Sequence, residues 1–403
     1  FSSPTDINKS TYFVFIFHSV PNSWKAKVLI YILFKKFLEF KVIMGDEADI
    51  LMPGQRIRPP SNNQTAVRLL KQLYGLNASS IVELNGYDDR NYHVICEESC
   101  TNPHITTISH HGYTLKIINY LDSQKTHMIE AQTEMLMFLN QRGINCPLPV
   151  KNIDGLYYTL VTLNVDEDTK RYAVRLLVYQ PGELLCRVPI TGELLRNVGN
   201  FTAKLSNVLM TFSHPAFVDH KALWMLNSVP KLRHFTFALN NVNKREIAHQ
   251  VIRSFEKDVL LVTSELQQGI IHGDLNEQNF VMDCNDREIG AVIDFGDSHR
   301  TCLIFELAIA LCYMLLQAGD VAMGKHVIEG YQELRKLTDL EKKILKVTVC
   351  ARICQSLVLG AYSHLYDRQN EYLLTTQRSG WVLLMKLWPL PQDEVLRNWG
   401  LMN

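Results

Sequence analysis

Two short motifs supply the residue types that phosphoryl transfer to an alcohol requires. Residues 271–279 read IHGDLNEQN, and residues 293–297 read IDFGD. A hydroxyl is a weak nucleophile and a nucleoside triphosphate is crowded with negative charge, so a catalyst must orient the hydroxyl, accept its proton and hold magnesium across the phosphates. Asp274 is therefore the candidate catalytic residue, and Asn279 and Asp294 are the candidate magnesium ligands.

The spacing of the motifs makes this interpretation specific. Asn279 follows Asp274 by five positions, as in the catalytic loop of the kinase superfamily. Two apolar runs, 280–282 and 291–293, flank a polar turn, and we expect them to form a β-hairpin that brings the two aspartates together. A surface turn plus an unrelated Asp-Phe-Gly would explain either motif alone, but not their joint spacing. We expect His272 to hydrogen-bond the backbone near the second aspartate, as a scaffold residue and not as the base.

A phosphate-binding lysine and its acidic partner are expected upstream. Lys116 lies in the strand-like run 113–118, where it would contact the α- and β-phosphates as a compact charge. The segment from about residue 124 to 140 has the apolar spacing of a helix. Glu130 and Glu134 lie four positions apart on one side of it. We expect one of them to pair with Lys116, and favour Glu130 because it comes earlier in the helix.

The segment 84–94 is the expected nucleotide-covering loop, although it contains a single glycine, Gly86. It joins two apolar runs in a hairpin-like arrangement, and a turn there would direct backbone amides at phosphate oxygens. Gly86 and Asn91 are the candidate nucleotide-binding residues. Asp88 and Asp89 would repel phosphate unless they bind magnesium, an arginine or backbone amides of the turn. An ordinary turn rich in Asp and Asn is the alternative.

The chain resembles the aminoglycoside phosphotransferase and choline kinase branch of the protein-kinase-like fold, which is marked by His-Gly-Asp in the catalytic loop. Within that branch it is similar to the hydroxylysine kinases, over about residues 60 to 385. Besides the catalytic motifs, the similarity rests on residues 86–94, 129–132, 174–182, 305–309 and 354–363.

The resemblance implies an α+β, two-lobed fold, with a small antiparallel sheet in the N-lobe and a mainly helical C-lobe. It also implies transfer of the γ-phosphate of GTP to the 5-hydroxyl of 5-hydroxy-L-lysine, with magnesium as cofactor and ATP as the alternative donor. The purine would lie against the segment that links the lobes, residues 178–182, which makes Tyr179 a further nucleotide-binding candidate.

The order of elements divides the chain accordingly. We expect residues 1–43 to be a non-native or disordered extension, with Met44 as the true start, and residues 44–60 to be a linker. Residues 61–180, with short strand runs and one helix, form the expected nucleotide-binding N-lobe. Residues 181–403 form the expected catalytic and substrate-binding C-lobe, with helical patterns at 194–210, 244–266, 303–316 and 342–363.

A small substrate suits the region after Asp294, where no Ala-Pro-Glu element or long activation segment follows. Hydroxylysine carries two ammonium groups and one carboxylate, so its pocket should offer carboxylates and a cation. Asp297 and Glu306 lie beyond Asp294. Asp297 is the candidate for an ammonium group, and stabilisation of the catalytic loop is the alternative role for it. Arg352, the only charge in the apolar run 347–362, is a candidate for the carboxylate, but a structural ion pair or a snorkelling side chain would also explain it.

Composition agrees with a neutral, two-lobed enzyme. The 403 residues are 47% hydrophobic and contain 41 basic and 41 acidic residues, which argues against an electrostatic grip on nucleic acid or an anionic membrane. The nine cysteines are scattered, as expected for reduced thiols in a cytoplasmic protein. A kinase for another small amino alcohol (choline, homoserine or an aminoglycoside) and a non-catalytic pseudokinase scaffold remain the alternatives. The sequence does not define the oligomeric state.

Overall fold

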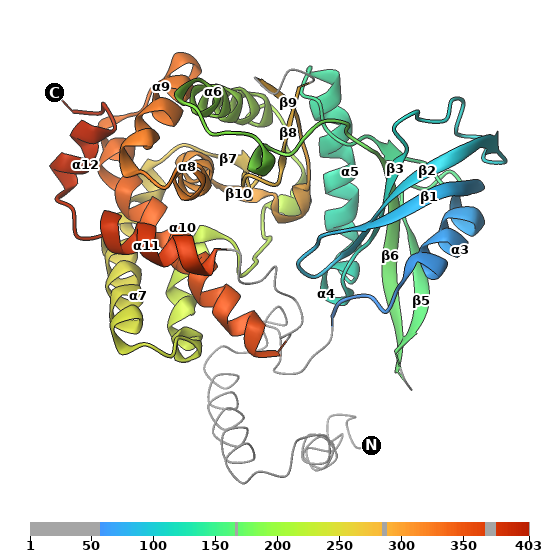
Figure 1. Ribbon diagram of the computed structural model, residues 1–403, viewed down its shortest axis with the longest axis horizontal. Coiled ribbons are helices and arrows are strands. Elements are labelled where there is room, and N and C mark those ends of the chain that lie inside the picture. Colours follow the sequence, from blue (N-terminus) through green and yellow to red (C-terminus); the bar gives the residue numbers. More distant parts are fainter. Residues whose placement is uncertain (1–56, 166–167, 284–287, 367–375, 403) are drawn as a thin grey trace, which may run out of the picture. The chain divides into compact units, whose positions relative to one another are not determined.

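The computed structural model describes residues 57–165, 168–283, 288–366 and 376–402. The predicted extension, most of the predicted linker and the polar turn of the predicted hairpin lie outside the described residues. The described part belongs to one compact unit that begins at residue 56. It contains an N-lobe built on an antiparallel sheet and a C-lobe that is mainly helical (Figure 1), so the predicted α+β, two-lobed architecture is confirmed.

The sheet of the N-lobe has the strand order β1-β2-β3-β6-β4, and β5 pairs with the outer part of β6. Every pair is antiparallel. The strands are β1 (Leu76–Leu84), β2 (Arg90–Cys100), β3 (Tyr113–Ile117), β4 (Pro149–Val150), β5 (Thr159–Val165) and β6 (Asp168–Val178).

The two faces of this sheet differ because side chains alternate along each strand. One face is apolar and packs against helix α3 (Asn63–Tyr74) in a common core, and the side chain of Asn62 caps this helix by accepting from the amide of Thr65. The opposite face carries Lys116, and the strand register places Asn91 and Arg175 on either side of it. Because of this alternation, the polar residues Lys116, Asn91 and Arg175 lie together on the face opposite the apolar core.

Two helices follow β3: the short α4 (Tyr120–Ser123) and α5 (Thr126–Gln141). Helix α5 confirms the predicted helix at residues 124–140. In Figure 1 it lies on the other side of the sheet from α3. Its buried positions follow the helical period and include Ile129, Gln132 and Leu136.

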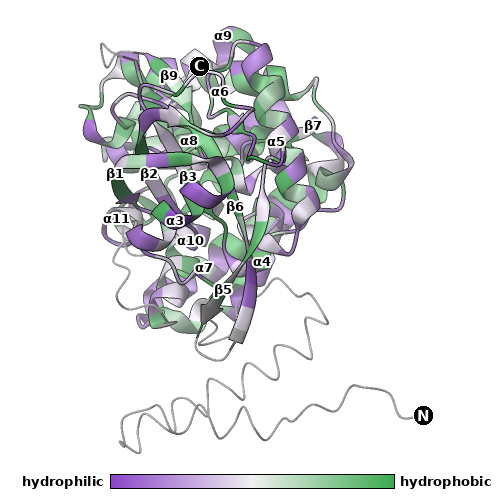
Figure 2. Cartoon of the chain, turned by 90° about the vertical axis from the view of Figure 1, so that its right-hand side faces the viewer, coloured by the Kyte–Doolittle hydropathy of each residue, from purple (hydrophilic) through white to green (hydrophobic). Residues whose placement is uncertain are grey.

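The C-lobe contains seven α-helices in the described part of the chain, and each of the four predicted helical segments overlaps one of them. Segment 244–266 changes character after Ser254, where a π turn and a 3-10 helix follow. Most helices carry both hydrophilic and hydrophobic residues, as Figure 2 shows. The helices are α6 (Gly192–Leu209), α7 (Val242–Ser254), α8 (Ile304–Ala318), α9 (Gly324–Leu334), α10 (Asp339–Tyr366), α11 (Gln377–Leu387) and α12 (Gln392–Asn398).

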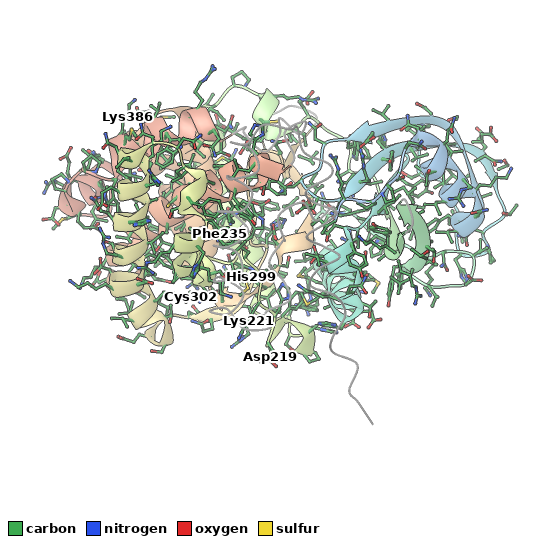
Figure 3. All side chains as sticks on the ribbon, turned by 90° about the horizontal axis from the view of Figure 1, so that it is seen from below. Asp219, Lys221, Phe235, His299, Cys302 and Lys386 are labelled. Atoms are coloured by element: carbon green, nitrogen blue, oxygen red, sulfur yellow. The ribbon has the colours of Figure 1, made fainter. Side chains whose placement is uncertain are left out.

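Two small antiparallel sheets in the C-lobe frame the catalytic motifs. Strand β7 (Gln268–Ile271) pairs with β10 (His299–Cys302), whose end residues are labelled in Figure 3. Strand β8 (Phe280–Met282) pairs with β9 (Ile289–Val292), which confirms the predicted hairpin between the two motifs.

Helix α10 is long and apolar enough to span a membrane by length and composition, yet 89% of its most apolar window is buried inside the protein. It packs against α7, α8 and α11. Its apolar character is therefore accounted for by its place in the core of the C-lobe.

Candidate active site

The catalytic loop begins where β7 ends and depends on one glycine. Gly273 has a φ of +85°, and a Cβ atom on it would lie 2.4 Å from the carbonyl oxygen of Asp297. Any other residue would be strained and would collide with that backbone. The loop and the segment after the second motif are thus in close contact.

A buried carboxylate from α8 holds the loop. Glu306 is fully buried and accepts hydrogen bonds from the amides of His272 and Gly273. Burial raises the pKa of Glu306 to about 7, against the lowering effect of the two amides. His272 Nε2 donates to the carbonyl oxygen of Ile293 at 3.0 Å, which confirms the predicted hydrogen bond to the backbone near Asp294.

Both oxygens of the Asp274 carboxylate are engaged. Oδ1 accepts from Arg352 Nη2 at 2.9 Å. Oδ2 accepts from Asn276 Nδ2 at 2.8 Å and from Asn279 Nδ2 at 3.1 Å. The carboxylate remains 22% exposed, so these donors fix its orientation while leaving it accessible.

The surroundings of Arg352 bear on the roles that the sequence left open for it, among them substrate binding and a structural ion pair. The side chain is 1% exposed, and Nη1 donates to the carbonyl oxygen of Trp224 and to Gln355 Oε1. The structural ion pair, which the sequence left open as the alternative, is observed, and its partner is Asp274. An arginine buried in this way has no exposed face for a substrate carboxylate.

Asp294 has an unusual backbone. Its φ of 62° and ψ of 74° make it the only residue other than glycine with positive φ in the described part of the chain. Such a conformation costs about 1–3 kcal/mol and is typical of functional sites. The amide of Ile293 donates to the carbonyl oxygen of Asn279 at 2.9 Å, so the two predicted metal ligands are joined through the backbone.

Lys116 lies between two carboxylates. Its Nζ is 2.8 Å from Asp294 Oδ1 and 3.0 Å from Asp89 Oδ2, and its side chain is 8% exposed. The Lys116 ammonium lowers the pKa of Asp294 to about 2. Burial alone would lower the pKa of Lys116, but the two carboxylates raise it above its usual value. The lysine is therefore charged and held by both lobes.

The prediction that a glutamate of α5 pairs with Lys116 is wrong in this structure. Glu130 accepts a hydrogen bond from the Tyr158 hydroxyl at 2.9 Å, and Glu134 lies 3.8 Å from His214 Nε2. Both glutamates are on the exposed side of α5, because the apolar residues of the helix occupy the side that faces the protein.

Gln132 is the polar residue that α5 presents to the site. Its Nε2 donates to the carbonyl oxygen of Gly296 at 3.3 Å, and its Oε1 accepts from Arg175 Nη1 at 3.1 Å. Arg175 is the register neighbour of Lys116 and is 3% exposed. Sequence reasoning missed Gln132, although a polar residue inside the apolar stripe of a helix was a visible signal.

Asn279 and Asp294 fit a magnesium ion by their donor chemistry. The Nδ2 group of Asn279 donates to Asp274, which leaves the carboxamide oxygen as a ligand. Asp294 adds a carboxylate, and magnesium takes oxygen ligands, usually one or two from the protein with the rest from phosphates and water. No cluster of three or more His, Cys, Asp or Glu side chains suited to a metal occurs in the described ranges.

The other nucleotide-binding candidates lie around the β1–β2 loop and the linker. A Cβ on Gly86 would meet the Asp89 carbonyl oxygen at 2.8 Å, so the loop is tightly folded there. The buried Asn91 Oδ1 has no hydrogen-bond partner among the described residues. Tyr179 stacks on His93 with ring centroids 3.7 Å apart. Their roles in nucleotide binding stay predictions.

Asp297 is half-buried, and its carboxylate has no hydrogen bond or ion pair with another described residue. Burial raises its pKa to about 8, and the nearby Asp274 adds to this effect while Arg352 opposes it. An acidic group in this state is suited to receive a cation from outside the protein.

Comparisons with known proteins agree with this geometry. A model of the phosphotransferase enzyme family (APH) matches residues 82–340, and the chain belongs to this family. It is a phosphotransferase that uses an alcohol group as acceptor.

The chain is similar to hydroxylysine kinases over most of its length. The chain is 33% identical to hydroxylysine kinase of Bos taurus over 359 residues, which are 86% of this chain and 94% of that protein. It is 32% identical to hydroxylysine kinase of Mus musculus over 356 residues, 85% of this chain and 93% of that protein. The resemblance to hydroxylysine kinases is thus confirmed.

A solved structure confirms the fold. The microcompartment-associated aminopropanol kinase superposes with a TM-score of 0.63 and covers 84% of this chain and 100% of its own, at 18% identity. At this identity the likeness concerns the protein-kinase-like fold alone.

Proposed function

We propose that this enzyme transfers the γ-phosphate of GTP to the 5-hydroxyl of 5-hydroxy-L-lysine, giving 5-phosphohydroxy-L-lysine and GDP. One observation carries the catalytic part of the proposal. The side chain of Asn279 donates a hydrogen bond to Asp274, and the backbone carbonyl oxygen of Asn279 accepts one from the amide of Ile293, the residue before Asp294. The base and the two metal ligands thereby form one unit. The similarity to hydroxylysine kinases over most of both chains supports the choice of acceptor.

On the acceptor side, Asp274 receives the hydrogen bond of the substrate hydroxyl and, as the new P–O bond forms, its proton. Arg352 and Asn276 hold the two carboxylate oxygens. Because the transition state of phosphoryl transfer is loose, orientation of the hydroxyl contributes more than early proton removal. A base whose orientation is fixed by three donors suits that task.

On the donor side, Lys116 neutralises the non-transferred phosphates, and Asn279 and Asp294 hold magnesium. The chemistry that magnesium would supply there is compensation of the negative charge that develops on the phosphates. Lys116 leaves Asp294 and turns to the phosphates, while the bond from the γ-phosphorus to the β-phosphate oxygen breaks and GDP departs. Gly86, Asn91 and Tyr179 are proposed to contact the nucleotide.

Asp297 is proposed to bind one ammonium group of the substrate. It is half-buried and unpaired, and Asp274 lies near enough to raise its pKa. The eight cysteines of the described part are free thiols, in keeping with a cytoplasmic enzyme.

The test is phosphorylation of a panel of small amino alcohols with magnesium and either GTP or ATP, with products identified by mass. We expect phosphorylated hydroxylysine as the main product and loss of activity with EDTA that returns with added magnesium. A higher rate with ATP would correct the donor. A higher rate with choline, homoserine or an aminoglycoside would replace the acceptor, and no product with any acceptor would favour a pseudokinase scaffold.

An aromatic pair beside Arg352 bears on choline, one of the alternative acceptors. A quaternary ammonium calls for a free aromatic cage. Tyr87 and Trp224 form an edge-to-face pair at 5.7 Å, but the Arg352 guanidinium already lies over the Trp224 ring. A cation therefore already lies against this aromatic pair.

A further inference from the structure

The β1–β2 loop supplies the second carboxylate that contacts Lys116. We propose that Asp89 is a positioning residue, which holds Lys116 toward the nucleotide phosphates in the place where a helix glutamate was expected. The inference rests on the proposed use of Lys116 at the phosphates. It assigns a function to an acidic loop residue that would otherwise repel them.

Asp89 is fixed independently of Lys116. Its Oδ1 accepts from the amide of Asn119 at 2.7 Å and from Asn119 Nδ2 at 3.0 Å. Asn119 in turn caps helix α4 by accepting from the amide of Asp122 at 3.0 Å. One oxygen is thus anchored to the start of a helix, and Oδ2 is left for the lysine. A carboxylate held in this way can orient a flexible four-carbon side chain.

Strand register explains why a loop residue reaches the lysine. Strand β2 begins at Arg90, opposite Ile117 of β3, so the residue just before it lies beside the end of β3. Arg90, the neighbouring cation, pairs with Glu83. Asp89 therefore pairs with Lys116 and not with the arginine next to it in sequence.

The two carboxylates that contact Lys116, those of Asp294 and Asp89, have different roles in the proposed reaction. Asp294 is needed as a metal ligand in the proposed function, and its side chain is 46% exposed. Asp89 is 18% exposed and bonded to the protein on its other oxygen. Asp89 is accordingly the carboxylate that stays with Lys116 once nucleotide is bound.

The test compares Asp89→Asn with a matched control. The asparagine keeps the shape and an acceptor for Asn119 but removes the charge that faces Lys116. We expect kcat/KM for the nucleotide to fall about 10- to 100-fold, with little change in KM for the acceptor and in melting temperature. Asp89→Glu should recover part of the loss. The control, Glu83→Gln, removes a carboxylate that pairs another cation of the same hairpin, and should behave as wild type.

A double variant shows whether Asp89 acts through Lys116. If it does, Asp89→Asn combined with Lys116→Met is no slower than Lys116→Met alone. Multiplied losses would overturn the proposal in favour of a separate structural role. Tighter nucleotide binding by Asp89→Asn with unchanged kcat would overturn it in favour of a carboxylate that blocks the phosphate site. Unchanged nucleotide kinetics in Lys116→Met would overturn the proposed role of the lysine as well. Unchanged nucleotide kinetics in Asp89→Asn, with a large loss in Lys116→Met, would overturn only the role of Asp89.

Discussion

The two catalytic aspartates are both paired with a cation, but the two pairs are built differently. Asp274 is held by Arg352, which lies within helix α10 of the same lobe, is 1% exposed and has hydrogen bonds to Trp224 and Gln355. Asp294 is held by Lys116, which comes from the sheet of the other lobe and also forms an ion pair with Asp89. One pair is part of a core, and the other joins two lobes.

The difference corresponds to what each aspartate has to do. The base must keep one orientation through the reaction, so a buried guanidinium with several partners suits it. The metal ligand must exchange its partner when nucleotide and metal bind, so a single ammonium on a flexible stem suits it. The comparison predicts that variants in the first pair affect stability and rate together, whereas variants in the second pair affect mainly the nucleotide and metal.

The largest effect is expected from Asp274→Asn. The asparagine retains the shape of the side chain and loses the ability to accept the hydroxyl proton. The turnover number should fall about 10³-fold, within the range for general bases, while nucleotide affinity measured by calorimetry stays near wild type. A rate near wild type would refute the assignment of Asp274.

Asp294→Asn is expected to come next. Asparagine tolerates the left-handed backbone at this position, so the fold should persist. Loss of the carboxylate should lower kcat/KM for the nucleotide about 10²- to 10³-fold and raise the magnesium concentration needed for half-maximal rate. An unchanged magnesium titration curve would show that Asp294 is not a metal ligand.

Arg352→Met tests the buried pair. It leaves Asp274 without its cation, and breaking a buried ion pair costs about 3–5 kcal/mol. Urea unfolding should show this loss, and the turnover number should fall at least about tenfold because the base loses one of its fixed donors. If the double variant Arg352→Met with Asp274→Asn were as unstable as the sum of the single variants, the two side chains would be energetically independent.

The pH dependence of acceptor binding is expected to report on Asp297. Its pKa, raised to about 8 by burial and by Asp274, means that the carboxylate ionises as pH rises through that value. The KM for a cationic acceptor should therefore fall, by up to about tenfold from pH 7 to pH 8.5. In Asp297→Asn the profile should be flat over this range, and an equally steep profile in that variant would assign the titration to another group.

The smallest effect is expected for the helix glutamates. Glu130 bonds Tyr158 on the exposed side of α5, away from Lys116. The turnover number and nucleotide KM of Glu130→Gln should stay within about twofold of wild type, as is usual for surface substitutions. A loss as large as that of Asp89→Asn would return the role of lysine partner to the helix.

The sequence was most informative where the relevant contacts are local. Asp274, Asn279 and the hairpin that leads to Asp294 lie within 21 residues, so spacing and turn chemistry were enough to place them together. The apolar period of α5 likewise predicted the helix and its bounds to within two residues. The same period, followed strictly, would have put Gln132 and not Glu130 on the side that faces the sheet.

Contacts that depend on tertiary placement were missed. Arg352 and Asp274 are 78 positions apart, and nothing local in α10 indicates that its one arginine meets the catalytic loop. The pairing of Asp89 with Lys116 depends on the register of β2 on β3, which a turn-like sequence leaves open. In both cases the residue was singled out by its charge, but its partner was not predictable.

The hydrogen bonds of Glu306 have a consequence for the motion of the catalytic loop. The amides of His272 and Gly273 both donate to the carboxylate of Glu306, which is inaccessible to solvent. Their protons can therefore exchange with water only when α8 separates from the loop. Exchange at these two positions should be as slow as in the central helices. A segment that performs chemistry would then be among the last parts of the chain to open.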